Sequence, residues 1–132
     1  FALLFYTNRR PVVQARDLPD NCDDEAVGVA IKANTWTHLA GTWDSKIFRL
    51  FINGEENISL PCAGKLLESQ EALFIGSRGG GLRFLDGSID DLRIYDYALN
   101  LKQIKLDMAK KMVVQKAGKI STSWARIKNN FF

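Results

Sequence analysis

The sequence predicts an all-β sandwich that ends in one short helix. Three observations support this fold class: short apolar runs separated by turn residues, an Asn-Gly pair at 53–54 between two of these runs, and a change in apolar spacing after residue 100. Frequent turns between short strands are typical of two packed antiparallel sheets. A chain of 132 residues with 46% hydrophobic and 25% charged content fits a single globular domain.

The first part of the chain supplies most of the predicted strands. They comprise residues 2–6, 12–16, 27–31, 36–44 and 47–53. Asn8-Arg9-Arg10-Pro11 is a turn signal and predicts a hairpin between the first two. The acidic stretch 17–25 is rich in strand breakers and predicts a loop. Asn53-Gly54 tolerates positive φ at both turn centres, so a tight hairpin leads into residues 55–60.

Two further strands are predicted at residues 72–77 and 88–97, and Gly79-Gly80-Gly81 lies in the connection between them. This glycine run lacks the Lys-Ser/Thr of a phosphate-binding loop. We expect two-layer packing around apolar residues of these strands: Leu39, Leu50, Ile52, Ile75, Leu92 and Ile94.

The C-terminal region differs from the rest in period and in charge. Leu101, Ile104, Met108 and Met112 recur every three or four residues, which predicts an amphipathic helix over 101–113. Asn100 and Gln103 have the spacing of a capping box. Residues 1–101 carry 10 Lys and Arg against 14 Asp and Glu, whereas residues 102–132 carry 8 against 1. Residues 114–132 are interpreted as a basic tail or linker, with nucleic-acid binding as a minor alternative.

The ordered set of motifs from Trp36 to Leu99 resembles the laminin-G-like, concanavalin A-like lectin/glucanase jelly roll. The matching residues are Trp36, His38, Leu39, Ala40, Asp44, Leu50 to Gly54, Ile75-Gly76, Gly87, Ile89, Asp90, Asp91, Arg93, Ile94, Tyr95 and Ala98-Leu99. The resemblance implies an antiparallel jelly-roll sandwich over residues 1–100. The family's opening strands are not visible here, so we expect N-terminal strands to be missing and a sheet edge to be left open.

The resemblance implies a non-catalytic recognition module that binds carbohydrate or protein ligands within a larger extracellular or cell-surface protein. Its partners would be a glycan or an extracellular protein, with neighbouring domains in a longer chain and no nucleic acid. No run reaches the roughly 18 apolar residues of a membrane span. A glycoside hydrolase on the same fold, or an adhesive spacer without a ligand, remains the alternative.

Aromatic residues are the first candidates for ligand contact, because flat rings suit the apolar faces of sugars. Trp36 occupies a strand position that the family uses for its core, so we expect it to be buried. Trp43 lies seven residues further on, which gives it the opposite strand parity. Trp43 and Phe51 are therefore the predicted ligand-binding residues.

Asp90 is the candidate metal ligand. Strand alternation places it on the face of Leu92 and Ile94, and a carboxylate in a core must be paired or bind a cation. The family resemblance implies a structural Ca²⁺ held by the matching acidic residue; the alternative is bonding to backbone N–H groups or Arg93. A second acidic cluster comprises Asp20, Asp23, Asp24 and Glu25, without the spacing of a preformed calcium loop.

No catalytic residues are predicted. His38 is the only histidine, and a Cys22–His38 or Cys62–His38 dyad has no local support. The Glu-x-Asp-x-x-Glu run of the related glucanases does not occur. The adjacent pairs Glu55-Glu56 and Asp90-Asp91 point to opposite faces of a strand and cannot share one scissile bond.

Two features fit an oxidising, extracellular setting. Cys22 and Cys62 are the only cysteines. They could form one disulfide or remain two free thiols, and the sequence leaves both alternatives open. Asn57-Ile58-Ser59 is a sequon, which makes Asn57 a predicted N-glycosylation site in a eukaryotic secretory pathway.

Overall fold

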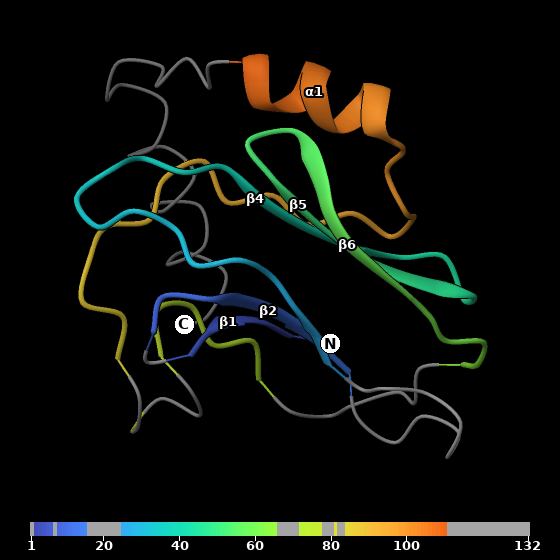
Figure 1. Ribbon diagram of the computed structural model, residues 1–132, viewed down its shortest axis with the longest axis horizontal. Coiled ribbons are helices and arrows are strands. Elements are labelled where there is room, and N and C mark those ends of the chain that lie inside the picture. Colours follow the sequence, from blue (N-terminus) through green and yellow to red (C-terminus); the bar gives the residue numbers. More distant parts are fainter. Residues whose placement is uncertain are drawn as a thin grey trace, which may run out of the picture.

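A computed structural model describes residues 2–6, 8–15, 25–65, 72–77, 81 and 84–110. The strands of this part of the chain form two three-stranded sheets, and one helix lies over the second sheet (Figure 1). All strand pairs are antiparallel. The predicted antiparallel β-sandwich with a short C-terminal helix is confirmed.

The first sheet has the order β1-β2-β3, with β1 spanning Ala2–Phe5, β2 spanning Pro11–Gln14 and β3 spanning Glu25–Val27. The predicted hairpin joins β1 to β2, and Arg9 has a φ of 62° in its turn. The carboxylate of Glu25 accepts hydrogen bonds from the hydroxyl of Tyr6 and the side-chain amide of Gln14. These contacts tie β3 to the β1–β2 hairpin.

The second sheet has the order β4-β5-β6, with β4 spanning Leu39–Trp43, β5 spanning Ile47–Ile52 and β6 spanning Glu55–Pro61. Asn53 and Gly54 join β5 to β6 with φ values of 51° and 75°. Both turn centres therefore have the positive φ that the Asn-Gly pair predicts, and the hairpin is confirmed.

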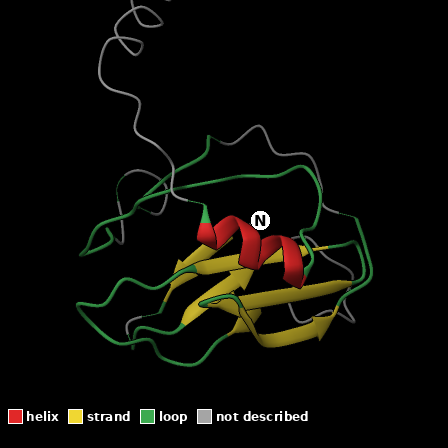
Figure 2. Cartoon of the chain, turned by 90° about the horizontal axis from the view of Figure 1, so that it is seen from above, coloured by secondary structure: helices red, strands yellow, loops and turns green. Residues whose placement is uncertain are grey.

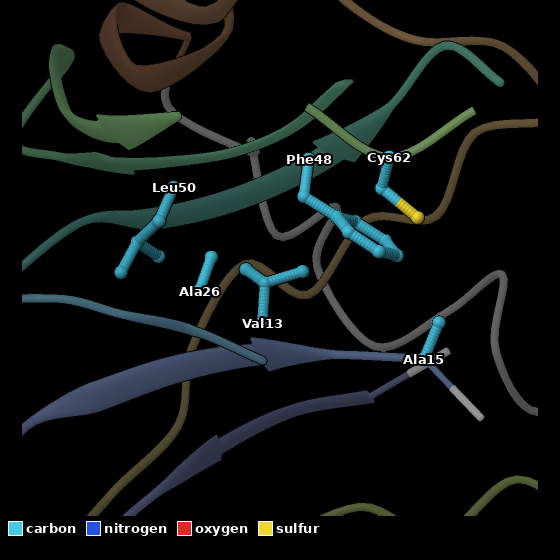
Figure 3. Packing of buried hydrophobic residues seen from close by; sticks show 6 residues of the cluster. All are labelled: Val13, Ala15, Ala26, Phe48, Leu50 and Cys62. Atoms are coloured by element: carbon cyan, nitrogen blue, oxygen red, sulfur yellow. The ribbon is translucent and has the colours of Figure 1, made fainter. Parts of the chain in front are cut away.

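The core lies between the two sheets (Figure 3). Side chains of β2, of β3 and of the residue that follows β2 point toward side chains of the second sheet. The cluster comprises Val13, Ala15, Ala26, Phe48, Leu50 and Cys62. Trp43, Ile58 and Leu60 pack against it from the second sheet. Phe48 and Leu50 are fully buried, so the central strand β5 provides the largest apolar contribution.

Helix α1 spans Leu101–Ala109 and covers the face of the second sheet that points away from the first (Figures 1 and 2). The predicted capping box is present: the Asn100 side chain accepts from the Gln103 backbone N–H, and the Gln103 side chain accepts from the Asn100 backbone N–H. Ile104 is 1% exposed, and a side chain at Gly54 would meet Met108 at 3.1 Å. The helix is thus seated over the β5–β6 turn.

The predicted strands at 72–77 and 88–97 are wrong, because the described residues of both ranges form no ladder with another described strand. Of the six expected core residues, Leu50 is buried and Leu39 and Ile52 are half-buried. The remaining three are largely exposed: Ile75, Leu92 and Ile94, at 57%, 51% and 68%. Alternating apolar residues become a strand only where a neighbour satisfies the backbone and covers one face.

Trp36 is 71% exposed, which corrects the expectation that it belongs to the core. It precedes β4, which begins only at Leu39, so Trp36 lies outside the described ladder of the second sheet. The predicted strand at 27–31 is also shifted. β3 begins at Glu25 and ends at Val27, because its ladder with β2 extends no further.

Candidate functional site

A polar cluster lies where α1 ends. Arg93 donates from Nη1 to the backbone oxygen of Asp107 at 2.6 Å and from Nη2 to that of Lys110 at 2.9 Å. Nη1 also lies 3.0 Å from Oδ1 of Asp107. The last carbonyl groups of a helix have no partner within the helix, so a guanidinium placed here satisfies them and complements the helix dipole. Arg93 therefore fixes the preceding segment to α1.

Tyr95 adds a second bond to the same carboxylate. Its hydroxyl donates to Oδ2 of Asp107 at 2.7 Å. The Tyr95 hydroxyl, followed by the Arg93 guanidinium, lowers the pKa of the Asp107 carboxyl, because both stabilise its charged form. The same bond raises the pKa of Tyr95 and keeps its hydroxyl protonated. Both carboxylate oxygens of Asp107 are thus engaged by named donors.

An aromatic pair extends from this anchor. Tyr97 is 57% exposed, and its ring centroid lies 5.8 Å from that of Tyr95 at an interplanar angle of 65°. This edge-to-face arrangement is favourable for aromatic rings. We call Arg93, Tyr95, Tyr97 and Asp107 the tyrosine cluster. It combines an exposed ring with a second ring whose hydroxyl is held in place.

The charged groups of the tyrosine cluster, Asp107 and Arg93, influence the pKa of His38. Its backbone N–H donates to Oδ1 of Asn53 at 3.0 Å, and its carbonyl accepts from the Asn53 N–H at 2.9 Å. Burial lowers the pKa of the imidazole, Asp107 opposes this shift, and Arg93 reinforces it. Nδ1 is buried without a hydrogen-bond partner among the described residues. Burial therefore favours the neutral form of the ring.

The tyrosine cluster was not predicted from the sequence, although a signal for it exists. Arg93, Tyr95 and Tyr97 are spaced by two residues, which in an extended chain places them on one side. The acidic partner comes from α1, 14 residues after Arg93. No local pattern links an extended segment to a residue on the next helix.

The predicted ligand-binding residues contribute to packing. Trp43 stacks on Phe48 with centroids 5.8 Å apart and donates from Nε1 to the backbone oxygen of Cys62 at 3.2 Å. Phe51 is 2% exposed on the covered second sheet, which corrects the expectation that it faces a ligand. Trp43 supports the core, and its role in ligand binding stays a prediction.

Asp90 is exposed, which corrects its expected position in the core. Its Oδ1 accepts from the backbone N–H of Asp91 at 2.9 Å, one of the two alternatives to a metal. Arg93 pairs with Asp107 instead. Among the described residues, no three His, Cys, Asp or Glu side chains gather in a group suited to a metal ion. Ca²⁺ takes six to eight oxygen ligands, backbone carbonyl groups among them, so a structural Ca²⁺ stays a prediction.

The other predicted sites are only partly described. Cys62 is disulfide-bonded, whereas Cys22 lies outside the described residues, so their pairing stays a prediction. Asp20, Asp23 and Asp24 also lie outside them, as does the tail from residue 111. Asn57 occupies the extra position of a bulge in β6, and its Oδ1 accepts from the Val29 N–H at 3.0 Å. Its glycosylation stays a prediction.

Across the described residues, no helix has the length and apolar character needed to cross a membrane.

Comparisons with known proteins agree with this architecture. The family model described as the concanavalin A-like lectin/glucanases superfamily matches residues 13–105. Among solved structures, the chain is similar to an S-layer domain-containing protein (residues 221–444) from Clostridium thermocellum, with 28% identity and a TM-score of 0.52. That match covers 64% of this chain and 45% of the other, so this chain spans less than half of the solved one. No curated protein matches. Because the family model covers well over half of the sequence, the chain belongs to the concanavalin A-like lectin/glucanases superfamily.

Proposed function

We propose that this chain is a non-catalytic recognition module of a larger cell-surface protein and that it binds carbohydrate through the tyrosine cluster. The single observation that carries the proposal is the exposed ring of Tyr97 beside the anchored ring of Tyr95. Sugars present apolar C–H faces that stack on aromatic rings, and a ring that is already fixed loses little entropy on binding. The S-layer domain-containing neighbour supports a surface location.

The electrostatics of the cluster favour binding over glycoside hydrolysis. A glycosidase needs a carboxylic acid whose pKa is raised, so that it can protonate the leaving group. The pKa of Asp107 is lowered instead, because Tyr95 and Arg93 stabilise its charged form. Asp107 is therefore suited to orienting Tyr95 and unsuited to donating a proton.

Glycan-array binding of the full chain, followed by titration of the best sugar, tests the proposal. Tyr97→Ala should weaken binding about tenfold, equal to about 1.4 kcal/mol, because the stacking face is lost. Tyr97→Phe keeps that face and should bind almost as well as the original chain. Trp36→Ala is the matched control, since it removes another exposed aromatic ring.

Three results would contradict the proposal. Equal losses in Tyr97→Ala and Trp36→Ala would show that the tyrosine cluster is not the specific site. Turnover of the bound sugar would establish an enzyme. An absence of binding to every glycan on the array would favour an adhesive spacer without a ligand.

A further inference from the structure

His38 lies where the second sheet meets α1. It directly precedes β4 and is hydrogen-bonded to Asn53, the residue that follows β5. Its backbone N–H donates to Oδ1 of Asn53 at 3.0 Å, and its carbonyl accepts from the Asn53 N–H at 2.9 Å. Alternation along the strand places the His38 side chain on the same face as Ala40, which pairs with the buried Phe51. This is the face that α1 covers (Figure 1).

The helix contacts the second residue of the same turn, Gly54. A Cβ atom at Gly54 would lie 3.1 Å from Cε of Met108 and 3.3 Å from Cγ of Lys105. Lys105 is thus the charged residue that α1 brings to this turn, and Glu55 adds an exposed carboxylate at the start of β6. Because His38 is bonded to one residue of the turn and α1 contacts the other, the imidazole lies at the contact that seats the helix.

The imidazole has no acceptor for a second proton in this position. Nδ1 of His38 is buried and has no hydrogen-bond partner among the described residues. A neutral imidazole carries one N–H group, whereas the protonated ring carries two. Protonation therefore makes Nδ1 a buried donor on a charged ring without an acceptor, which is costly. This conclusion is the same for either tautomer of the neutral ring.

Two further charged groups act on the imidazole, and both belong to the tyrosine cluster. Asp107 of α1 attracts a protonated His38, and Arg93 repels it. Both oxygens of the Asp107 carboxylate are already engaged, one by the Tyr95 hydroxyl and the other by the Arg93 guanidinium. A movement of this carboxylate toward a protonated ring would draw it away from these donors. Proton uptake at His38 is therefore opposed to the bonds that hold the tyrosine cluster.

We propose that His38 is an acid-sensitive switch for the seating of α1. Protonation of the imidazole loosens α1 on the β5–β6 turn, and the bonds from Arg93 and Tyr95 to Asp107 loosen with it. The sandwich stays folded, because its core lies on the other face of the second sheet. The consequence for ligand rests on the proposed function: carbohydrate is released from Tyr97 at acidic pH, because Tyr95 is no longer held beside it.

Amide hydrogen exchange of the full chain tests the switch without a ligand. After correction for intrinsic exchange, amides of α1 such as those of Ile104 and Asp107 should exchange about threefold to tenfold faster at about pH 5.5 than at about pH 7.5. An exposed imidazole titrates near pH 6.5, and one group changes an equilibrium by at most about tenfold per pH unit. Amides of the β1–β2 turn, in the other sheet, should not respond.

His38→Gln is the variant that removes the titration and keeps the backbone bonds to Asn53. Its α1 amides should exchange equally at both pH values. Because His38 is the only histidine, no other side chain has an unperturbed pKa within this interval. An NMR titration of the unaltered chain needs no variant: the midpoint of the imidazole titration should coincide with the midpoint of the change in α1 exchange.

Exchange of α1 that is the same at both pH values, or that responds equally in His38→Gln, would overturn the switch. An imidazole that titrates without any effect on α1 would overturn it as well. Glycan titration at the two pH values separates this inference from the proposed function. A pH-responsive α1 without sugar binding contradicts the proposed function and supports the switch, whereas sugar binding that ignores a responsive α1 contradicts the coupling between them.

Discussion

The two-sheet body and residues 86–97, which we call the open segment, contain similar apolar alternation but differ in packing. In β5, alternating apolar residues are buried between two neighbouring strands, as Phe48 and Leu50 show. In the open segment, Leu92 and Ile94 alternate in the same way and remain more than half exposed. Alternation therefore sets which side of a strand is apolar, whereas burial depends on neighbours supplied from elsewhere.

The largest expected effect compares two phenylalanines. Phe48→Ala should lower the free energy of unfolding by about 3–5 kcal/mol, because Phe48 is fully buried between the sheets and its removal leaves a cavity. Phe84→Ala removes the same atoms from a side chain that is 70% exposed and should cost about 0.5 kcal/mol or less. Denaturant unfolding measures both. Similar losses would show that burial does not determine the cost of removing the ring at these two positions.

A comparison of two glycines sharpens the contrast. A Cβ atom at Gly28 would lie 2.5 Å from Cδ2 of Leu50 and 2.9 Å from Oδ1 of Asn57. Gly28→Ala should therefore cost about 1–3 kcal/mol through overpacking. At Gly87 the nearest atom would be Cγ of Leu85 at 3.8 Å, an ordinary contact. Gly87→Ala should be almost neutral in thermal unfolding, and an equal loss at both positions would refute close packing at Gly28.

The sequence predicted local features best, because neighbouring residues determine them. The Asn53-Gly54 hairpin, the β1–β2 hairpin and the Asn100 capping box are all present. Long-range features were predicted less well. One of these features is the burial of Phe51 on the sheet face that α1 covers. The other is the pairing of Arg93 with Asp107 of α1. Both depend on how α1 is seated over the second sheet. No pattern within either segment indicates that placement.

Helix α1 contacts both regions, because it packs over the β5–β6 turn and its Asp107 pairs with Arg93. The cap of this helix can be tested separately. Asn100→Ala should cost about 1 kcal/mol, because the Gln103 backbone N–H loses its partner. Lys102→Ala, at an exposed position of the same first turn, should be neutral. Thermal unfolding followed by circular dichroism measures both variants. A neutral Asn100→Ala would show that packing over the β5–β6 turn alone holds α1.

The smallest expected effect concerns pH. The folded-state pKa of His38 is lowered below its usual 6.5 by burial, so the unfolded chain binds the proton more readily. The resulting stability is fully present above about pH 6.5 and is lost as the pH falls from there through the folded-state pKa. His38→Gln should flatten this dependence in denaturant unfolding. Because His38 is the only histidine, an unchanged slope in the variant would contradict its assignment.

The central claim is that the sandwich is stabilised by contacts between its sheets around β5. Residue-resolved amide hydrogen exchange of the full chain tests it most directly, since the most protected amides report global unfolding. The slowest amides should belong to Phe48, Leu50 and Phe51, whose side chains are buried on both faces of the central strand. Faster exchange in β5 than in the open segment would contradict this claim.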